Sequence, residues 1–348
     1  MSLNEKDLPS RWWDPHIHQD RKPFLIKRQV ITHEIRKFFY NQSFTEVEAT
    51  CLQISPGNET HISAFETNFY DGSNQKQRLY LHTSPEFMCK KLLAAGETKL
   101  FTLAKVFRNR ERGPLHHPEF TMLEWYRTDD IATLYCDMHE LIKAAARSVN
   151  CQSVNWKGKT ANPYDQPLHI SVVEAFSLYA QIDLLPLLND LTSFSNIASN
   201  MNIRISNDDT WSDIFSKIMS QCIEPHLGQD RLTFLTDYPA SEAALAKLNP
   251  KDNRFAQRFE AYLCGVEISN AFAELTNPEE QRSRFQHAMQ EKQRIYGESY
   301  PIDEDFMDAL SLMPEACGIA LGLDRLIMLL SHAQHIEQII WAPIETKI

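Results

Sequence analysis

The chain has 348 residues, 43% of them hydrophobic, which is enough for one large folded domain or two modest ones. It contains neither an apolar run long enough to cross a membrane nor a charged-then-apolar leader, which argues against a membrane or secreted protein. The net charge of −11 argues against sequence-independent binding of nucleic acid, which requires a positive surface.

The seven cysteines are scattered, and no two of them form a Cys-x-x-Cys pair. An odd number without regular spacing is typical of reduced, structural thiols, so we expect a cytoplasmic protein without a zinc site. The first residues are polar, and no internal repeat or linker is visible. We therefore expect a flexible segment over residues 1–22 and a single domain over residues 23–348.

The first predicted element is a helix that opens at Pro23, where a proline is well tolerated at the first helical position. Ile31, Ile35 and Phe39 recur at helical spacing and predict one buried face. A short strand is expected within residues 44–50, FTEVEAT. This part of the chain thus begins with a long helix that leads into a sheet.

A second strand is expected at residues 79–82, followed by a helix start at Ser84-Pro85-Glu86. Serine at the N-cap, proline next and glutamate in the first turn satisfy the free amides and the helix dipole. Gly96 is a suitable residue for the end of this helix.

Residues 99–107 and 119–127 alternate in the manner of strands, and Gly-Pro and Pro residues interrupt the segment between them. We expect a long antiparallel hairpin whose loop, residues 108–118, carries the charged sequence RNRERGPLHHP. A helix is expected near 131–149. The residues between this helix and about residue 250 predict mixed helix and loop, and they contain no chemical motif.

Near the end of the chain, residues 258–275 predict two strands that turn at a glycine, and Asn277 caps the helix that follows. Residues 317–322 predict a strand rich in small residues that leads into a helix beginning near Asp324. Taken together, the elements predict an α+β fold, an antiparallel sheet flanked by helices.

Many arginines and glutamates fall on these strands or at their ends, where burial without a partner would cost several kcal/mol. The alternative is a set of internal ion pairs, but we expect that such pairs do not account for the whole group. A ligand with charges of both signs, such as a nucleotide with an amino acid, fits it better. The charged residues concerned are Arg108, Arg110, Glu111, Arg112, Glu119, Glu124, Arg258, Glu260, Glu267, Glu274 and Arg325.

Three stretches resemble the signature motifs of class II aminoacyl-tRNA synthetases. FRNRERGPLHHPEFTMLEWYR is similar to motif 2, GIALGLDRL to motif 3, and the first helix with FTEVEAT to motif 1, the dimer-forming element. HTSPEF, PEFTMLEWY and GVEISNAFAEL resemble the lysine-specific branch of that class. The resemblance spans roughly residues 24–332 and implies the class II catalytic fold, ATP as a substrate and a homodimer.

The length of the segment before motif 1 indicates which branch the chain resembles. Lysyl-tRNA synthetases carry an anticodon-binding β-barrel there, and residues 1–22 are too few for one, so we expect no such domain. The free-standing members that the chain resembles activate (R)-β-lysine or lysine with ATP and transfer it to a lysine side chain of elongation factor P. They also carry alanine at the position of Ala320, where lysyl-tRNA synthetases have glycine. The extra methyl would crowd an α-amino group and tolerate a β-amino group.

The resemblance implies the residues that hold ATP. Arg108 would contact the α-phosphate and Arg325 the γ-phosphate, and Phe120 would stack on adenine. With Glu267, the two arginines are the expected catalytic residues, and Glu260 and Glu267 would ligate Mg²⁺. The full set expected to bind ATP is Arg108, Asn109, Arg110, Glu111, His117, Phe120, Glu267, Ile268, Gly322 and Arg325. For His117, a buried histidine with a backbone partner is the alternative.

The resemblance also implies the residues that hold the amino acid. Ser84 and Glu86 would bind its amino group, Glu274 and Tyr126 would hold the side-chain ammonium with help from Glu124, and Asn270 would contact the carboxylate. Phe272 would line the pocket. The full set expected to bind this substrate is Ser84, Pro85, Glu86, Glu124, Tyr126, Asn270, Phe272, Glu274 and Ala320.

Two positions depart from the family pattern. Motif 2 has Arg110 where a glutamate is usual, so we expect Glu111 to take the adenine-side role and Arg110 to contribute its backbone. Thr50 stands where motif 1 usually has proline, which bears on the dimer interface.

Rival interpretations remain open. The chain is also compatible with a truncated lysyl-tRNA synthetase paralogue that charges tRNA or makes diadenosine polyphosphate, although its acidity makes tRNA an unlikely partner. Another alternative is a non-catalytic regulatory pseudo-synthetase. Such a protein is expected to have lost the residues that contact ATP, yet Arg108, Glu267 and Arg325 are present. A synthetase that forms an amide from an adenylate and ammonia is a further, weaker alternative.

Overall fold

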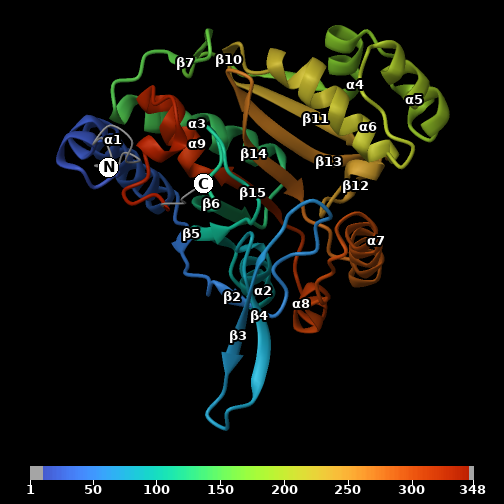
Figure 1. Ribbon diagram of the computed structural model, residues 1–348, viewed down its shortest axis with the longest axis horizontal. Helices are drawn as coiled ribbons and strands as arrows, with labels where there is room; N and C mark the ends of the chain where they lie inside the picture. Colours follow the sequence, from blue (N-terminus) through green and yellow to red (C-terminus); the bar gives the residue numbers. More distant parts are fainter. Residues whose placement is uncertain (1–10, 345–348) are drawn as a thin grey trace, which may run out of the picture.

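The computed structural model describes residues 11–344, and within them nine strands form one large sheet (Figure 1). These strands are β1 (Thr45–Glu46), β5 (Lys99–Phe107), β6 (Glu119–Arg127), β9 (Leu168–Ser171), β11 (Thr233–Pro239), β12 (Leu248–Asn249), β13 (Asp252–Leu263), β14 (Val266–Ala273) and β15 (Cys317–Gly322). Their order is β1-β5-β6-β15-β14-β13-β11-β9, with β12 beside β13. From β5 to β11 the pairing is antiparallel, whereas β1 and β9 join the two ends in parallel. The predicted antiparallel sheet is confirmed.

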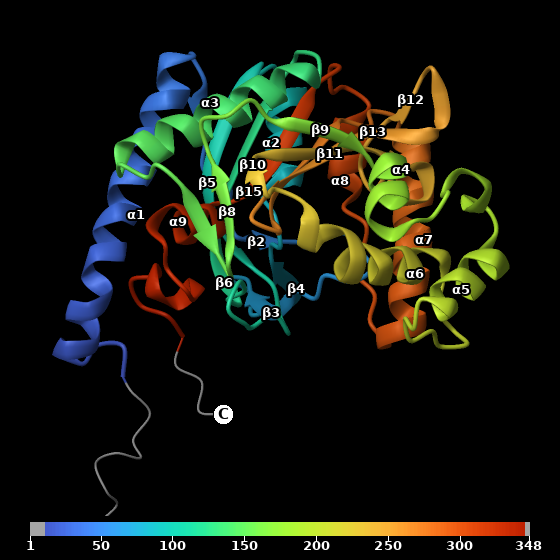
Figure 2. The same ribbon diagram turned by 90° about the horizontal axis from the view of Figure 1, so that it is seen from above.

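Three helices cover one face of the sheet: α1 (Pro15–Asn41), α3 (Ala132–Ser148) and α9 (Leu323–Ser331) (Figure 2). Every second residue of β6 points toward them, so Leu123 and Trp125 are fully buried in the largest apolar cluster. Phe39 of α1 stacks on Phe101 of β5 with ring centroids 4.5 Å apart. The helical spacing read from the sequence therefore identified the buried face of α1.

The opposite face of the sheet is covered by α2 (Glu86–Ala94), α7 (Pro278–Tyr296) and α8 (Glu304–Leu310). Phe87 and Phe306 stack there with centroids 4.1 Å apart, and Tyr126 of β6 packs in the same cluster. The side chain of Asn277 accepts hydrogen bonds from two amides of the first turn of α7, and Gly297 ends that helix with a φ of +68°. The start of α7 at Asn277 was predicted from the sequence.

A smaller sheet combines β2 (Leu52–Gln53) with the hairpin of β3 (Phe65–Tyr70) and β4 (Lys76–Leu81), which protrudes from the body of the molecule (Figure 1). The strand expected at residues 79–82 is the end of β4. The rest of the hairpin was not predicted, because it is mostly exposed and has no regular apolar alternation.

The segment that was difficult to interpret from the sequence contributes two parts. β7 (Val154–Trp156), β8 (Lys159–Asn162) and β10 (Asp230–Arg231) form a three-stranded sheet, and β9 and β11 extend the main sheet. Between them α4 (Val172–Ala175), α5 (Leu191–Asn200) and α6 (Trp211–Ile218) surround a separate core in which Phe176 stacks on Phe215. Short helical turns are Phe176–Ala180, Leu185–Leu187, Met219–Ile223, Glu224–His226, Ala240–Glu242 and Ile336–Gln338.

The start of α1 differs from the prediction. The helix begins at Pro15, with the Asp14 side chain accepting from His16 N at 2.9 Å, and Pro23 lies in its interior. The added turns are held in place because the buried Arg21 guanidinium donates to the carbonyl of Ile340. Residues 15–22 are therefore helical and the expectation of a flexible segment was wrong for them, whereas residues 1–10 lie outside the described residues.

Among residues 11–344, no helix combines the length and apolar character that a membrane span requires.

Candidate active site

The register of four central strands places several residues expected to bind the amino acid in two rows. Both rows lie on the face of the sheet opposite α1, α3 and α9. Asn270 of β14 lies beside Ala320 of β15, Ala320 lies beside Glu124 of β6, and Glu124 lies beside Thr102 of β5. The next row along places Phe272, Gly318 and Tyr126 side by side. Because side chains two apart on a strand share a face, both rows present their side chains to the same space.

A cavity opens over this face, with an empty volume of about 940 Å³ including the part open to solvent. The predicted site residues that line it are Ser84, Glu86, Arg108, Glu111, His117, Phe120, Glu267, Ile268, Asn270, Phe272, Ala320, Gly322 and Arg325. Those that do not line it are Pro85, Asn109, Arg110, Glu124, Tyr126, Glu260 and Glu274.

The two arginines expected at the phosphates both line the cavity. The Arg108 guanidinium lies 5.3 Å from the centre of the Phe120 ring and donates to the carbonyl of Thr83 at 3.4 Å. Arg325 Nη1 donates to the Glu267 carbonyl oxygen at 2.9 Å and lies 3.5 Å from the Glu267 carboxylate. Both guanidiniums are partly exposed and keep donors available to an anion.

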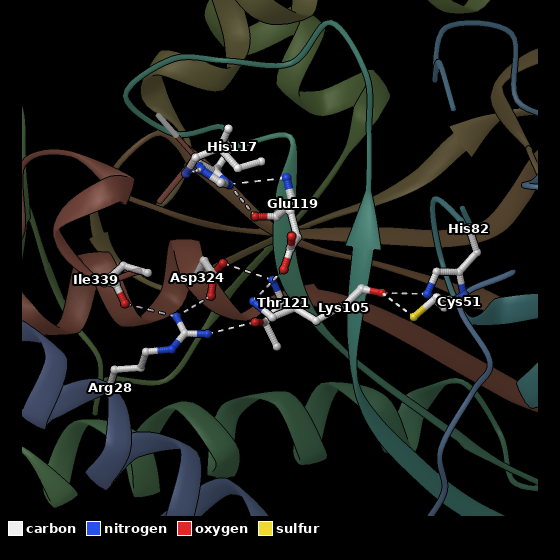
Figure 3. Close-up of polar contacts among 10 residues, drawn as sticks. Arg28, Cys51, His82, Lys105, His117, Glu119, Thr121, Asp324 and Ile339 are labelled. Atoms are coloured by element: carbon white, nitrogen blue, oxygen red, sulfur yellow. Dashed lines mark hydrogen bonds and ion pairs between the residues drawn. The ribbon is translucent and has the colours of Figure 1, made fainter. Parts of the chain in front are cut away.

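Asp324 fixes the orientation of the helix start that carries Arg325. Its buried carboxylate accepts from Arg28 at 2.5 Å and from the Thr121 amide at 3.0 Å, which ties α9 to α1 and β6 (Figure 3). Arg28 also donates to the Thr121 hydroxyl at 2.8 Å. This network makes Asp324 a structural residue that sets where Arg325 points.

In the loop between β5 and β6, the neighbouring side chains of Arg110 and Glu111 have different surroundings. Glu111 faces the cavity, whereas the Arg110 guanidinium pairs with Glu298 at the end of α7. Arg110 has a φ of +66°, a left-handed conformation that turns the chain and separates the two side chains. The adenine-side role of Glu111 and the backbone role of Arg110 stay predictions.

The two adjacent histidines of this loop have different surroundings. His117 is buried, its Nδ1 donates to the Glu119 carbonyl at 2.5 Å, and its Nε2 accepts from the Ile344 amide at 3.1 Å (Figure 3). That geometry matches the alternative of a buried histidine with backbone partners. His116 instead accepts from Arg325 Nη2 at 2.7 Å, and burial and then Arg325 lower its pKa, which keeps it neutral. His116, not singled out from the sequence, is the histidine that contacts a predicted catalytic residue.

At the amino-acid end, Glu124 is fully buried and held by two hydroxyls. Ser84 donates to one carboxylate oxygen at 2.5 Å, and Tyr126 donates to the other at 2.7 Å. Burial, and then the neighbouring Glu86, raise the pKa of Glu124 to about 8. Ser84 also accepts from the Glu86 amide at 3.0 Å, but the N-cap residue of α2 is Pro85, one position later than the sequence predicted.

Lys90 links the two glutamates expected to hold the substrate amines. Its Nζ lies 2.6 Å from Glu86 and 2.6 Å from Glu274, and the lysine side chain is only 1% exposed. The sequence analysis assigned both glutamates to the substrate and did not predict this internal partner. Residue spacing alone could have shown the contact with Glu86, because residues four apart lie on the same side of a helix.

Arg258 orients the side chain expected at the substrate carboxylate. Its Nε donates to the Asn270 side-chain oxygen at 3.1 Å, so the amide nitrogen of Asn270 is left as a donor toward the cavity. Its Nη2 donates to Glu260 at 2.7 Å, and the Tyr262 hydroxyl donates to the other Glu260 oxygen at 2.6 Å. Arg258 and Glu260 thus form an internal pair.

Several further charged residues are paired within the protein. Arg112 contacts Glu337, and Lys105 lies 3.6 Å from Glu119. The expectation that charges on this sheet serve a ligand was therefore wrong for Arg110, Arg112 and Glu119, and it stays a prediction for the charges that line the cavity.

The pair expected to bind Mg²⁺ partly fits that ion. Burial, and then the nearby Glu260, raise the pKa of Glu267, which shows two carboxylates repelling each other. No cluster of three or more metal-binding side chains occurs among residues 11–344. Mg²⁺ is often held by one or two carboxylates together with substrate phosphates, so Glu267, which lines the cavity, and Glu260 behind it suit a metal that arrives with ATP.

Gly318 is required by the packing of the amino-acid end. A Cβ atom at this position would lie 2.3 Å from a carboxylate oxygen of Glu274 and 2.3 Å from the ring of Tyr126. Only a glycine allows these two side chains to approach the strand so closely. The sequence analysis noted a strand rich in small residues but gave no role to this one.

The family model described as class II tRNA synthetases (D, K and N) matches residues 4–346, and the chain belongs to this family. Within it, the chain is similar to proteins named elongation factor P–(R)-β-lysine ligase. Those of Salmonella arizonae, Salmonella paratyphi B and Salmonella choleraesuis are each 36% identical to it, over 91% of this chain and 94% of theirs. The resemblance inferred from the three motifs is confirmed.

Proposed function

We propose that this chain activates (R)-β-lysine or lysine with ATP and transfers it to a lysine side chain of elongation factor P. The proposal is supported by the relatives named elongation factor P–(R)-β-lysine ligase, which match 91% of the chain. The single structural observation that carries it is a cavity lined by Arg108, Arg325 and Glu86, in which Glu86 is joined through Lys90 to the buried Glu274. That distribution suits a substrate that is anionic at one end and diammonium at the other.

In the first step, the substrate carboxylate attacks the α-phosphorus of ATP, a P–O bond forms, and pyrophosphate leaves. The carboxylate is already ionised, so this step needs no general base. Arg108 and Arg325 would stabilise the negative charge on the phosphates, and Asn270 would direct its amide nitrogen to the carboxylate. The protein contributes position and electrostatic stabilisation.

In the second step, the amine of the acceptor lysine attacks the carbonyl carbon of the adenylate. The new C–N bond is an amide, the C–O bond to the phosphate breaks, AMP leaves, and the amine proton passes to solvent. We propose that Glu267 and Glu260 hold Mg²⁺ during activation, where the ion would neutralise phosphate charge.

We further propose a cytoplasmic homodimer formed through α1. Ile26, Val30 and Tyr40 are apolar or aromatic side chains on this helix and are 49%, 39% and 53% exposed. Exposed groups of this kind on one helix are typical of a surface that another chain covers.

Transfer of labelled lysine distinguishes this function from its rivals. The purified chain is incubated with ATP, Mg²⁺ and labelled (R)-β-lysine or lysine, and with either elongation factor P or tRNA. We expect label on the protein and none on tRNA. Label on tRNA would support the truncated lysyl-tRNA synthetase, and no label with either acceptor would support a non-catalytic subunit.

A further inference from the structure

Lys90 is a cation placed where proteins rarely tolerate one. It lies on α2, fully inside the protein, and its ammonium touches one carboxylate from its own helix and one from the end of β14. Burying a lone ammonium would cost several kcal/mol, so these two contacts are what permits it to be there. The ammonium thereby joins Glu86 and Glu274, which come from elements far apart in the sequence.

The two carboxylates face different parts of the site. Glu86 lines the cavity, whereas Glu274 is 1% exposed and packs against Gly318 and the Tyr126 ring. Each uses one oxygen to contact Lys90, which leaves the other oxygen free of that contact. One buried ammonium therefore sets the positions of two carboxylates at once.

The titratable groups around Lys90 are mostly acids, and burial keeps Tyr126 and Cys89 neutral by raising the pKa of each. Glu86 and Glu274 lie close to Glu124 and Tyr126 of β6 and to Cys89 of α2, and Glu59 lies near Glu86. Lys247 is the other cation that acts on Glu274. Burial opposes the charge on Lys90, but Glu274 and then Glu86 raise its pKa, so it stays protonated at neutral pH. Burial raises the pKa of Glu274 to about 7, and Lys90 is the largest influence that opposes the rise.

We propose that Lys90 is a positioning residue for the diamino acid: it fixes the carboxylates of Glu86 and Glu274, so that they can receive the substrate's ammonium groups. This inference rests on the function proposed above. It assigns to Lys90 a role in substrate specificity rather than in stability alone.

The test compares Lys90→Met with Lys91→Met in amino-acid-dependent ATP–pyrophosphate exchange. Lys91 is the matched control, because it is the next residue of the same helix and pairs with Asp303 at 2.9 Å and Asp305 at 2.7 Å instead. We expect Lys90→Met to raise the KM for lysine and for (R)-β-lysine by at least about tenfold, as for loss of a charged contact. The KM for ATP should change little, and Lys91→Met should keep both KM values.

The pH profile separates positioning from stability. Without Lys90, the pKa of Glu274 rises further, so this carboxylate holds a proton at neutral pH and attracts an ammonium group less. In Lys90→Met the KM for lysine should therefore fall as the pH rises from 6.5 to 8.5, more steeply than in the unchanged chain. A variant that is only less stable would lose activity without this pH dependence.

Removal of a buried charge can also unfold a protein, so Lys90→Arg is measured in parallel. It keeps the positive charge but places a larger, planar group between the carboxylates. We expect a raised KM for lysine with the pH profile of the unchanged chain. A normal KM for lysine in Lys90→Arg, or in a folded Lys90→Met, overturns the inference. If the unchanged chain shows no lysine-dependent exchange, the proposed function fails and this inference fails with it.

Discussion

Replacement of Gly318 by alanine tests the amino-acid end of the site with a single methyl group. In the structure that methyl would lie 2.3 Å from both a Glu274 oxygen and the Tyr126 ring, far inside normal contact distance. Neither neighbour is free to yield, since Glu274 is held by Lys90 and the Tyr126 hydroxyl by Glu124. The substitution must therefore displace groups that we expect to bind the side-chain ammonium.

The expected size of the effect follows from two costs. Overpacking of a well-packed interior costs about 1–3 kcal/mol, which should lower the Tm by a few degrees. Displacing Glu274 removes a charged contact with the substrate worth about 1.5–3 kcal/mol, or roughly 10- to 100-fold in the KM for lysine. The KM for ATP should stay within about twofold, because no predicted ATP ligand touches Gly318.

The assay is ATP–pyrophosphate exchange at varied lysine and varied ATP, with Gly72→Ala as the control. Gly72 lies in the turn between β3 and β4, and an added Cβ there meets nothing within 4 Å. An unchanged KM for lysine in a folded Gly318→Ala variant would refute the placement of the substrate beside Glu274. An equal rise in both KM values would point to general disruption instead.

Three further predictions concern other parts of the site. Arg108→Ala should lower ATP–pyrophosphate exchange by about one to two powers of ten, as for loss of a charged contact; near-normal exchange would place the phosphates elsewhere. Ala320→Gly should raise the use of α-lysine relative to (R)-β-lysine in the same assay, and an unchanged ratio would remove the steric argument. Glu124 binds a proton more tightly in the folded chain, with a pKa of about 8, so its contribution to stability falls as pH rises toward that value. The Tm of Glu124→Gln minus the Tm of the unchanged chain should therefore increase from pH 6 to 8.5. A difference that does not change with pH would contradict the raised pKa of Glu124.

Much of the sheet was predictable because its strands alternate clearly. The alternation along residues 119–127 predicted a strand, and these residues form β6, in which Met122, Glu124 and Tyr126 share a face. Helix ends were predicted where a specific cap residue stands, as Asn277 does for α7. The start of α1 was missed because Pro23 resembled a first-turn proline, whereas Asp14 and Pro15 provide the actual helix start.

The contacts within the site were less predictable, because they depend on tertiary packing. Lysine is rarely buried, so its residue type favoured a surface position for Lys90. His116 and His117 are adjacent, and the sequence does not indicate which ring faces Arg325 and which faces the backbone. Gly318 became informative only when the distances to its neighbours were known.

The measurement that tests the central claim most directly is ATP–pyrophosphate exchange with lysine and (R)-β-lysine side by side, followed by the mass of elongation factor P. The account predicts exchange that depends on a diamino acid and a mass increase of one such residue on the acceptor. Exchange without any dependence on a diamino acid, or an unmodified acceptor despite exchange, would contradict it.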